Sequence, residues 1–108
     1  MTDRLAEMFA RTRAEHRPAV MPFLPAGWPE LHDTVRLVEA AIEGGADGFE
    51  IGMPFLDPLG DGPVNQVAYT QAIANGCTTE TVFEAIRTLR SRGVSAPLLV
   101  MGYFNTIL

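Results

Sequence analysis

Residues 47–63 read DGFEIGMPFLDPLGDGP, a short apolar strand followed by a loop rich in proline, glycine and aspartate. In the strand, over 47–52, the apolar side chains of Phe49 and Ile51 flank the carboxylate of Glu50. Successive side chains of a strand point to opposite faces, so Phe49 and Ile51 share one face and Glu50 lies on the other. A carboxylate inside a fold is costly unless it is paired or takes part in chemistry. Glu50 is therefore a candidate general acid or base, although near the strand's end it could also reach solvent or cap a loop.

The loop after this strand carries a second carboxylate, Asp61, between Gly60 and Gly62. A loop of this composition can fold back over the C-terminal end of the strand, where barrel enzymes place their active sites. Asp61 would then face the same cavity as Glu50. The alternative is a local turn, which aspartate commonly forms beside glycine or proline. The same alternative applies more strongly to Asp57, which stands before Pro58.

Helical and strand patterns alternate on both sides of this stretch. Apolar residues recur at helical spacing in four segments and form short continuous runs in the strand segments. Proline and glycine mark most of the boundaries between them. In chain order we predict a helix that Thr2 and Asp3 can cap and that runs to about His16, a strand over 19–24, and a helix from Pro29 that stops at Gly44. The strand over 47–52 and a helix from about 64 to 74 follow. The last helix is capped by Thr78, turns Val82, Phe83, Ile86 and Leu89 inward and stops at Gly93, and a final strand covers 97–101.

Helical connections between apolar strands indicate parallel strands in an α/β sheet. Three parallel strands cannot close a barrel, and an open sheet of this size leaves both edges unpaired. We therefore predict an α/β fold that is the front part of a larger α/β barrel. The chain would supply the N-terminal helix, strands 1–3 and their helices, as one incomplete domain over residues 1–108.

The composition excludes several classes of chemistry. The 8 basic residues are all arginine and face 13 acidic residues, for a net charge of −5. Without lysine there is no Schiff-base residue, no pyridoxal-phosphate anchor and no Walker-type phosphate loop in these residues. An acidic chain without a basic cluster also argues against nucleic acid as the main partner.

Cysteine, histidine and hydropathy patterns favour a protein of the cytoplasm. The single cysteine, Cys77, cannot form an internal disulfide, and we expect a small packed residue at the start of a helix. The first residues carry no apolar signal segment, and no apolar run approaches the roughly 18 residues that span a bilayer. His16 and His32 lack metal-ligand spacing, so we expect no metal site. We expect no membrane partner either.

Aromatic and apolar side chains gather at the ends of the first and third predicted strands. These are Phe23 on the first strand and Met101, Tyr103 and Phe104 on or after the third. They could line a pocket of aromatic size, or they could simply belong to the barrel core.

Residues 49–63, FEIGMPFLDPLGDGP, resemble the signature of the tryptophan synthase alpha chain family, E-[LIV]-G-x-P-[FY]-S-D-P-x-A-D-G-P. PFLPAG at 22–27 and MGYFN at 101–105 are similar to the family's first-strand and third-strand segments. The resemblance covers essentially the whole chain but less than half of a family member. The sequence departs from the family pattern at a few positions, namely Leu56 for serine, Gly60 for alanine, Trp28 for aspartate, and Val64 and Asn65 for a threonine-isoleucine pair.

The resemblance implies a TIM (β/α)8 barrel and a lyase of tryptophan biosynthesis. Such an enzyme cleaves indole-3-glycerol phosphate to indole and glyceraldehyde 3-phosphate by a retro-aldol step, without metal or cofactor. Carried over to this sequence, Glu50 is the catalytic acid/base and Asp61 holds the indole N–H. Phe23, Met101 and Tyr103 would line the indole pocket.

The resemblance also implies a partner, the pyridoxal-phosphate beta chain of an alpha2-beta2 assembly. Asp57, Pro58 and Asn105 would face that chain, and pyridoxal phosphate would belong to it. Two alternatives remain open, namely a stand-alone lyase that releases indole without a beta chain, and a non-catalytic remnant or scaffold that binds a beta-type partner. The family's phosphate-binding residues have no counterpart in these 108 residues, so we expect the piece alone to be inactive.

Overall fold

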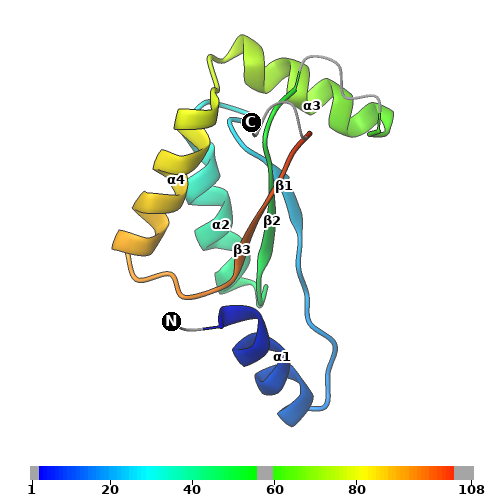
Figure 1. The fold of residues 1–108 in the computed structure, drawn as a ribbon, viewed down its shortest axis with the longest axis vertical. Coiled ribbons are helices and arrows are strands. Elements are labelled where there is room, and N and C mark those ends of the chain that lie inside the picture. The colour runs from blue at the N-terminus through cyan, green and yellow to red at the C-terminus, as the bar shows by residue number, and fades with distance from the viewer. Residues whose placement is uncertain (1–2, 56–59, 104–108) are drawn as a thin grey trace.

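A computed structural model describes residues 3–55 and 60–103 of the chain. Four helices and three strands alternate along it much as the sequence predicts (Figure 1). Their bounds are α1 (Arg4–Ala14), β1 (Phe23–Pro25), α2 (Asp33–Glu43), β2 (Phe49–Gly52), α3 (Pro63–Ala74), α4 (Thr79–Ser91) and β3 (Leu98–Met101).

The three strands form one parallel sheet in the order β1-β2-β3, which confirms the predicted α/β arrangement. Helices α2 and α4 pack on one face of this sheet. Phe49 and Ile51 of β2 point into that layer and are fully buried with Val38, Val82 and Leu89 of the two helices. Burial of each such side chain stabilises the fold by about 1.5–3 kcal/mol. We call the opposite sheet face, which carries Glu50, the inner face.

Helix α3 lies across the C-terminal ends of the strands, and α1 lies beyond their N-terminal ends (Figure 1). None of the helices described is long and apolar enough to cross a membrane.

The first strand is shorter than predicted because of its prolines. Residues 19–22 run beside β2: the carbonyl of Val20 accepts from the Asp47 N–H at 2.8 Å, and that of Pro22 from the Glu50 N–H at 3.0 Å. Pro22 has no N–H to return to a ladder, so the regular strand begins only at Phe23. The prediction that α2 begins at Pro29 was also wrong, since the helix starts at Asp33.

Helix α4 begins where the sequence predicts, and its inward stripe is narrower than predicted. Thr78 caps it with a capping box shared with Thr81. Val82 and Leu89 are fully buried, whereas Phe83, predicted to point inward, is 42% exposed. At 3.6 residues per turn, Phe83 lies about 100° around the helix from Val82, outside the stripe that faces the sheet.

A buried carboxylate fastens the N-terminal end of the sheet, a feature that the sequence did not reveal. Asp47 is 3% exposed and accepts two hydrogen bonds from Arg17, one from Arg11 and one from the backbone N–H of Val20, at 2.9–3.0 Å. These donors, Arg17 first, hold the pKa of Asp47 well below its usual range. Because Arg11 belongs to α1 and Arg17 to the segment after it, Asp47 ties that part of the chain to β2.

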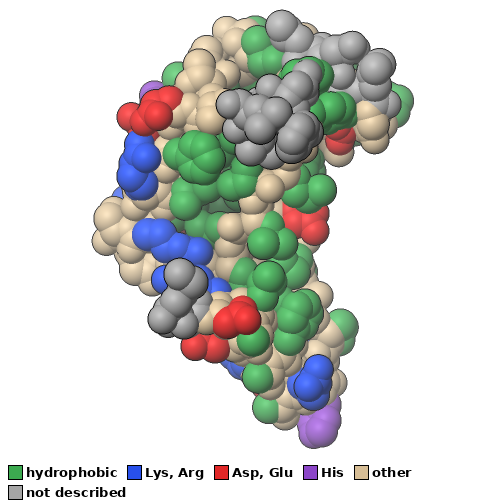
Figure 2. Space-filling model, in the orientation of Figure 1, with side chains coloured by type: hydrophobic (Ala, Val, Ile, Leu, Met, Phe, Trp, Pro, Cys, Tyr) green, Lys and Arg blue, Asp and Glu red, His purple; other side chains and the backbone are tan. Residues whose placement is uncertain are grey.

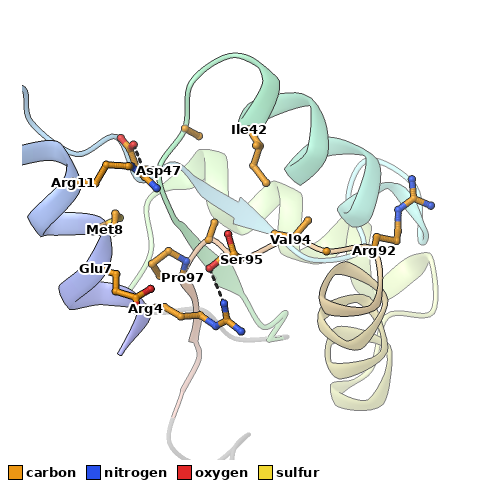
Figure 3. A pocket seen from close by; sticks show the side chains of 13 residues that line it. Arg4, Glu7, Met8, Arg11, Ile42, Asp47, Arg92, Val94, Ser95 and Pro97 are labelled. Atoms are coloured by element: carbon orange, nitrogen blue, oxygen red, sulfur yellow. Dashed lines mark hydrogen bonds and ion pairs between the residues drawn. The ribbon is translucent and has the colours of Figure 1, made fainter. Parts of the chain in front are cut away.

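Figure 3 shows the cavity beside this cluster, about 300 Å³ in volume, with the Arg11–Asp47 pair at its edge. Arg4 of α1 closes another side of the cavity by donating to the backbone carbonyl of Ser95 at 3.0 Å. Three separate parts of the chain therefore meet at this end, namely α1, the turn before β2 and the turn before β3.

Candidate active site

The candidate site lies on the inner face, where the strands end. In the sheet register Glu50 pairs with Phe23 on one side and Leu99 on the other. Two residues further along the strand, Gly52 pairs with Met101. In-register residues of parallel strands present their side chains on the same face. Met101 is 46% exposed and Leu99 37%, and hydrophobic side chains gather over the strands in Figure 2.

Glu50 is half-buried on the inner face, between fully buried neighbours that point the other way. Its backbone N–H is tied to Pro22, which fixes the position of the residue in the sheet. Within residues 3–55 and 60–103, its carboxylate makes no hydrogen bond and no ion pair. A half-buried carboxylate left without a structural partner is available to exchange a proton with a ligand.

Among the described residues, the Asp61 carboxylate accepts no hydrogen bond from a nearby backbone N–H, as the local turn left open by the sequence would require. Its carboxylate oxygen Oδ2 accepts a hydrogen bond from the hydroxyl of Tyr103 at 2.8 Å, across 42 residues of sequence. The same hydroxyl accepts from the Gly60 N–H at 2.7 Å, and Gln66 Nε2 donates to the Asp61 carbonyl at 2.8 Å. The loop before α3 is thus fastened to the segment after β3.

The ring of Tyr103 is held in place by aromatic stacking. It lies against Phe55 with ring centroids 4.8 Å apart and planes 15° from parallel. An offset stack of this kind contributes about 0.5–1.5 kcal/mol beyond the area buried. The stacking therefore also fixes the position of the hydroxyl that binds Asp61.

A cavity of about 310 Å³ opens at this point and brings the predicted pocket residues together with Asp61. Phe23 of β1 lines it together with Met101 at the end of β3 and Tyr103 two residues further on. That these side chains bind an aromatic ligand stays a prediction. Glu50 lies next to Phe23 in the sheet but not on the wall of this cavity. The complete lining is Phe23, Gly60, Asp61, Tyr69, Met101, Gly102 and Tyr103.

Tyr69 of α3 is a wall residue that the sequence interpretation did not single out. It is 3% exposed, and its ring meets that of Phe23 edge-on, with centroids 6.4 Å apart. Burial, followed by the negative charge of Asp61, raises the pKa of Tyr69 to about 12. The sequence contained one signal: Ala68, Tyr69 and Ala72 mark a buried face of a helix that begins just after Asp61.

Gly52 makes room for this wall. A Cβ atom there would lie 2.5 Å from the ring of Phe23 and 2.7 Å from the hydroxyl oxygen of Tyr69. Both aromatic side chains therefore reach over the end of β2 only because residue 52 has no side chain.

The predicted partner-facing residues Asp57, Pro58 and Asn105 lie outside the described residues. In the part of the chain that the structure describes, no group of three histidine, cysteine, aspartate or glutamate side chains could hold a metal ion. Cys77 is buried beside the Thr78 cap, as expected for a packed residue at the start of a helix.

Known proteins match the chain over nearly its whole length. Residues 9–108 match the family described as tryptophan synthase alpha chain. The tryptophan synthase alpha chain of Chloroflexus aurantiacus is 49% identical over 105 residues, which cover 97% of this chain and 40% of that protein. Tryptophan synthase of Saccharomyces cerevisiae is 41% identical over 108 residues, 15% of its length.

Solved structures agree with the sequence matches. The crystal structure of tryptophan synthase subunit alpha from Legionella pneumophila superposes with a TM-score of 0.94 at 32% identity, over 99% of this chain and 41% of that one. This match confirms the predicted fold, the N-terminal part of a TIM barrel. The chain spans about 40% of the length of the curated alpha chains that it matches.

Proposed function

Because the chain belongs to the tryptophan synthase alpha chain family, we propose that it contributes the first part of a lyase of tryptophan biosynthesis. The reaction is the retro-aldol cleavage of indole-3-glycerol phosphate to indole and glyceraldehyde 3-phosphate. The observation that carries the proposal is the Asp61 carboxylate, held by Tyr103 on the wall of a cavity with Phe23 and Met101.

The proposed chemistry needs two proton movements. A proton is added to C3 of the indole ring, which places positive charge on the ring nitrogen. The glycerol hydroxyl beside the bond to be broken then loses its proton and becomes the aldehyde, and the electron pair of the carbon–carbon bond returns to the ring. Glu50 acts as the acid and base in these transfers, and Asp61 accepts the ring N–H and stabilises the charged intermediate.

The arrangement on the inner face supports this division of roles. Glu50 makes no structural pairing among the described residues, so its carboxylate is available for proton transfer. Asp61 is held in one position by Tyr103, which suits a fixed contact to a ring N–H. The aromatic and apolar side chains beside it match a flat, apolar ring.

The partner in this proposal is a beta chain that carries pyridoxal phosphate and receives the indole. Asp57, Pro58 and Asn105 would face it. The cleavage itself uses no cofactor.

The test is Glu50→Gln in the natural-length protein, with indole release as the readout. We expect the rate to fall by about 10²- to 10⁴-fold, the contribution of a positioned acid/base group, while the substrate still binds. The matched control is Glu43→Gln, because Glu43 is exposed on the last turn of α2 and has no ion pair among the described residues.

Two further outcomes separate the alternatives. Indole release that does not change when a beta chain is added would favour a stand-alone lyase. If the unaltered protein had no lyase activity but still bound a beta chain, that result would favour a scaffold. If Glu50→Gln released indole as fast as the Glu43→Gln control, Glu50 would have no role in the mechanism.

A further inference from the structure

The hydroxyl of Tyr69 is a buried polar group on the wall of the candidate cavity. Its side chain is 97% removed from solvent, since only 3% remains exposed. The ring is fixed edge-on against Phe23, with planes 80° apart, so the hydroxyl has a defined position. Tyr69 lines the same cavity of about 310 Å³ as Asp61.

The position of this hydroxyl follows from Gly52. A Cβ on Gly52 would lie 2.7 Å from the Tyr69 oxygen, so the oxygen occupies the space directly above the end of β2. Gly52 and Glu50 lie on the same face of β2, two residues and about 7 Å apart along the strand. The hydroxyl therefore lies over the inner face at Gly52, the next residue after Glu50 on that face, and close enough to Asp61 for its charge to act on Tyr69.

Among residues 3–55 and 60–103, the Tyr69 hydroxyl makes no hydrogen bond. Buried polar groups of native proteins are almost always paired, and an unpaired one destabilises the fold. Burial raises the pKa of Tyr69 to about 12, so the group keeps its proton at neutral pH and can donate it. Such a donor suits an acceptor atom of a ligand in the cavity.

We propose that the Tyr69 hydroxyl donates a hydrogen bond to a hydroxyl oxygen of the polyol chain on an indole ligand, and that it thereby determines specificity. The inference rests on the proposed function. In that function Asp61 accepts a hydrogen bond from the ring N–H, and the aromatic side chains of the cavity pack against the indole ring. The remaining polar part of the ligand is the hydroxylated chain, on which Glu50 acts in that function. The Tyr69 oxygen lies over Gly52, the next residue after Glu50 on the inner face of β2.

The test compares two probes in the natural-length protein, with Glu50→Gln present so that neither is cleaved. One probe is indole-3-glycerol phosphate. The other is the phosphate ester of indole-3-propanol, whose propyl chain lacks the hydroxyls. We expect Tyr69→Phe, which keeps the ring packing, to weaken binding of the hydroxylated probe by about 3- to 10-fold. Binding of the plain probe should change by less than about 2-fold.

Tyr103→Phe is the matched control, because the chain has 2 tyrosines and both line the cavity. Its hydroxyl holds Asp61, which serves the ring N–H of both probes, so this variant should weaken both equally. In the Glu50→Gln protein with both tyrosines intact, the NMR signal of the Tyr69 ring carbon that bears the hydroxyl should shift more with the hydroxylated probe than with the plain one.

Equal effects of Tyr69→Phe on the two probes, or no effect on either, would overturn the inference and leave the proposed function intact. If the parent protein bound neither probe, the proposed function would fail, and the inference with it.

Discussion

At the N-terminal end of the strands the carboxylate of Asp47 accepts four hydrogen bonds, whereas on the inner face that of Glu50 accepts none from the described residues. Both groups belong to the same short stretch of chain around β2. Asp47 is satisfied by two arginines and a backbone N–H, and it holds α1 on the sheet. Under the proposed function, this difference would separate a stabilising end of the strands from a catalytic end, the arrangement known in barrel enzymes.

Asp61 lies between these two cases. It has one firm partner, the Tyr103 hydroxyl, and it lies on a cavity wall rather than inside a closed cluster. Two oxygens of a carboxylate can accept more hydrogen bonds than this. Asp61 is thus positioned by the protein and still able to bind a ligand.

The largest expected effect on stability comes from Asp47→Asn. The change keeps the size of the side chain but leaves Arg17 and Arg11 without their shared counter-charge, so the free energy of unfolding should fall by about 3 kcal/mol. Urea unfolding of the natural-length protein measures it. Glu80→Gln removes the exposed ion pair with Arg87 and should cost less than about 1 kcal/mol.

Binding of an indole ligand should survive Asp47→Asn wherever the protein is folded. If Asp47→Asn weakened ligand binding as strongly as it lowered stability, the proposal that one end of the strands stabilises the fold and the other binds the ligand would fail.

The contribution of Asp47 to the free energy of unfolding should disappear at acid pH. Its pKa is lower in the folded than in the unfolded protein, so its contribution is complete above the usual aspartate pKa of about 4 and is lost as the pH falls through the folded value. Unfolding measured from neutral to acid pH should show the gap between the unaltered protein and Asp47→Asn narrowing below about pH 4. A constant gap would mean that packing, not charge, is responsible.

At the other end, Gly52→Ala should act mainly on ligand binding. The added Cβ must displace the Phe23 ring, which it would approach to 2.5 Å. Since over-packing costs about 1–3 kcal/mol, we expect indole binding to weaken by about 10-fold.

Gly44→Ala serves as the control for Gly52→Ala. Its Cβ would make only ordinary contacts, the nearest at 3.4 Å, at the far end of α2. Equal binding by both variants would show that the aromatic wall does not form the ligand site.

The smallest expected effect is the stability change on Tyr103→Phe. The variant keeps the stack on Phe55 but removes the hydrogen bond to the Asp61 carboxylate and the one from the Gly60 N–H, so the free energy of unfolding should fall by about 1–2 kcal/mol. Thr70→Val, which removes an exposed hydrogen bond to the Gln66 carbonyl on α3, should change it by less than about 0.5 kcal/mol. A Tyr103→Phe cost as large as that of Asp47→Asn would erase the contrast between the two ends.

Local patterns carried much of the fold and part of the candidate site. The alternation around Glu50 predicted correctly which neighbours would be buried against helices. The caps at Asp3 and Thr78 were also confirmed. Prediction failed where a local rule competed with tertiary context, as at Phe83 and at the start of α2.

The sequence by itself determined the parallel α/β order, the face on which Glu50 lies and the family, because strand and helix periods and a contiguous signature are local properties of the chain. Only the tertiary structure decided that Tyr103 holds Asp61, that Tyr69 lines the same cavity and that Arg17 and Arg11 share Asp47. The physical reason is distance along the chain. A hydrogen bond forms between groups within about 3 Å in space, and for residues tens of positions apart that closeness depends on how the whole sheet and its loops pack.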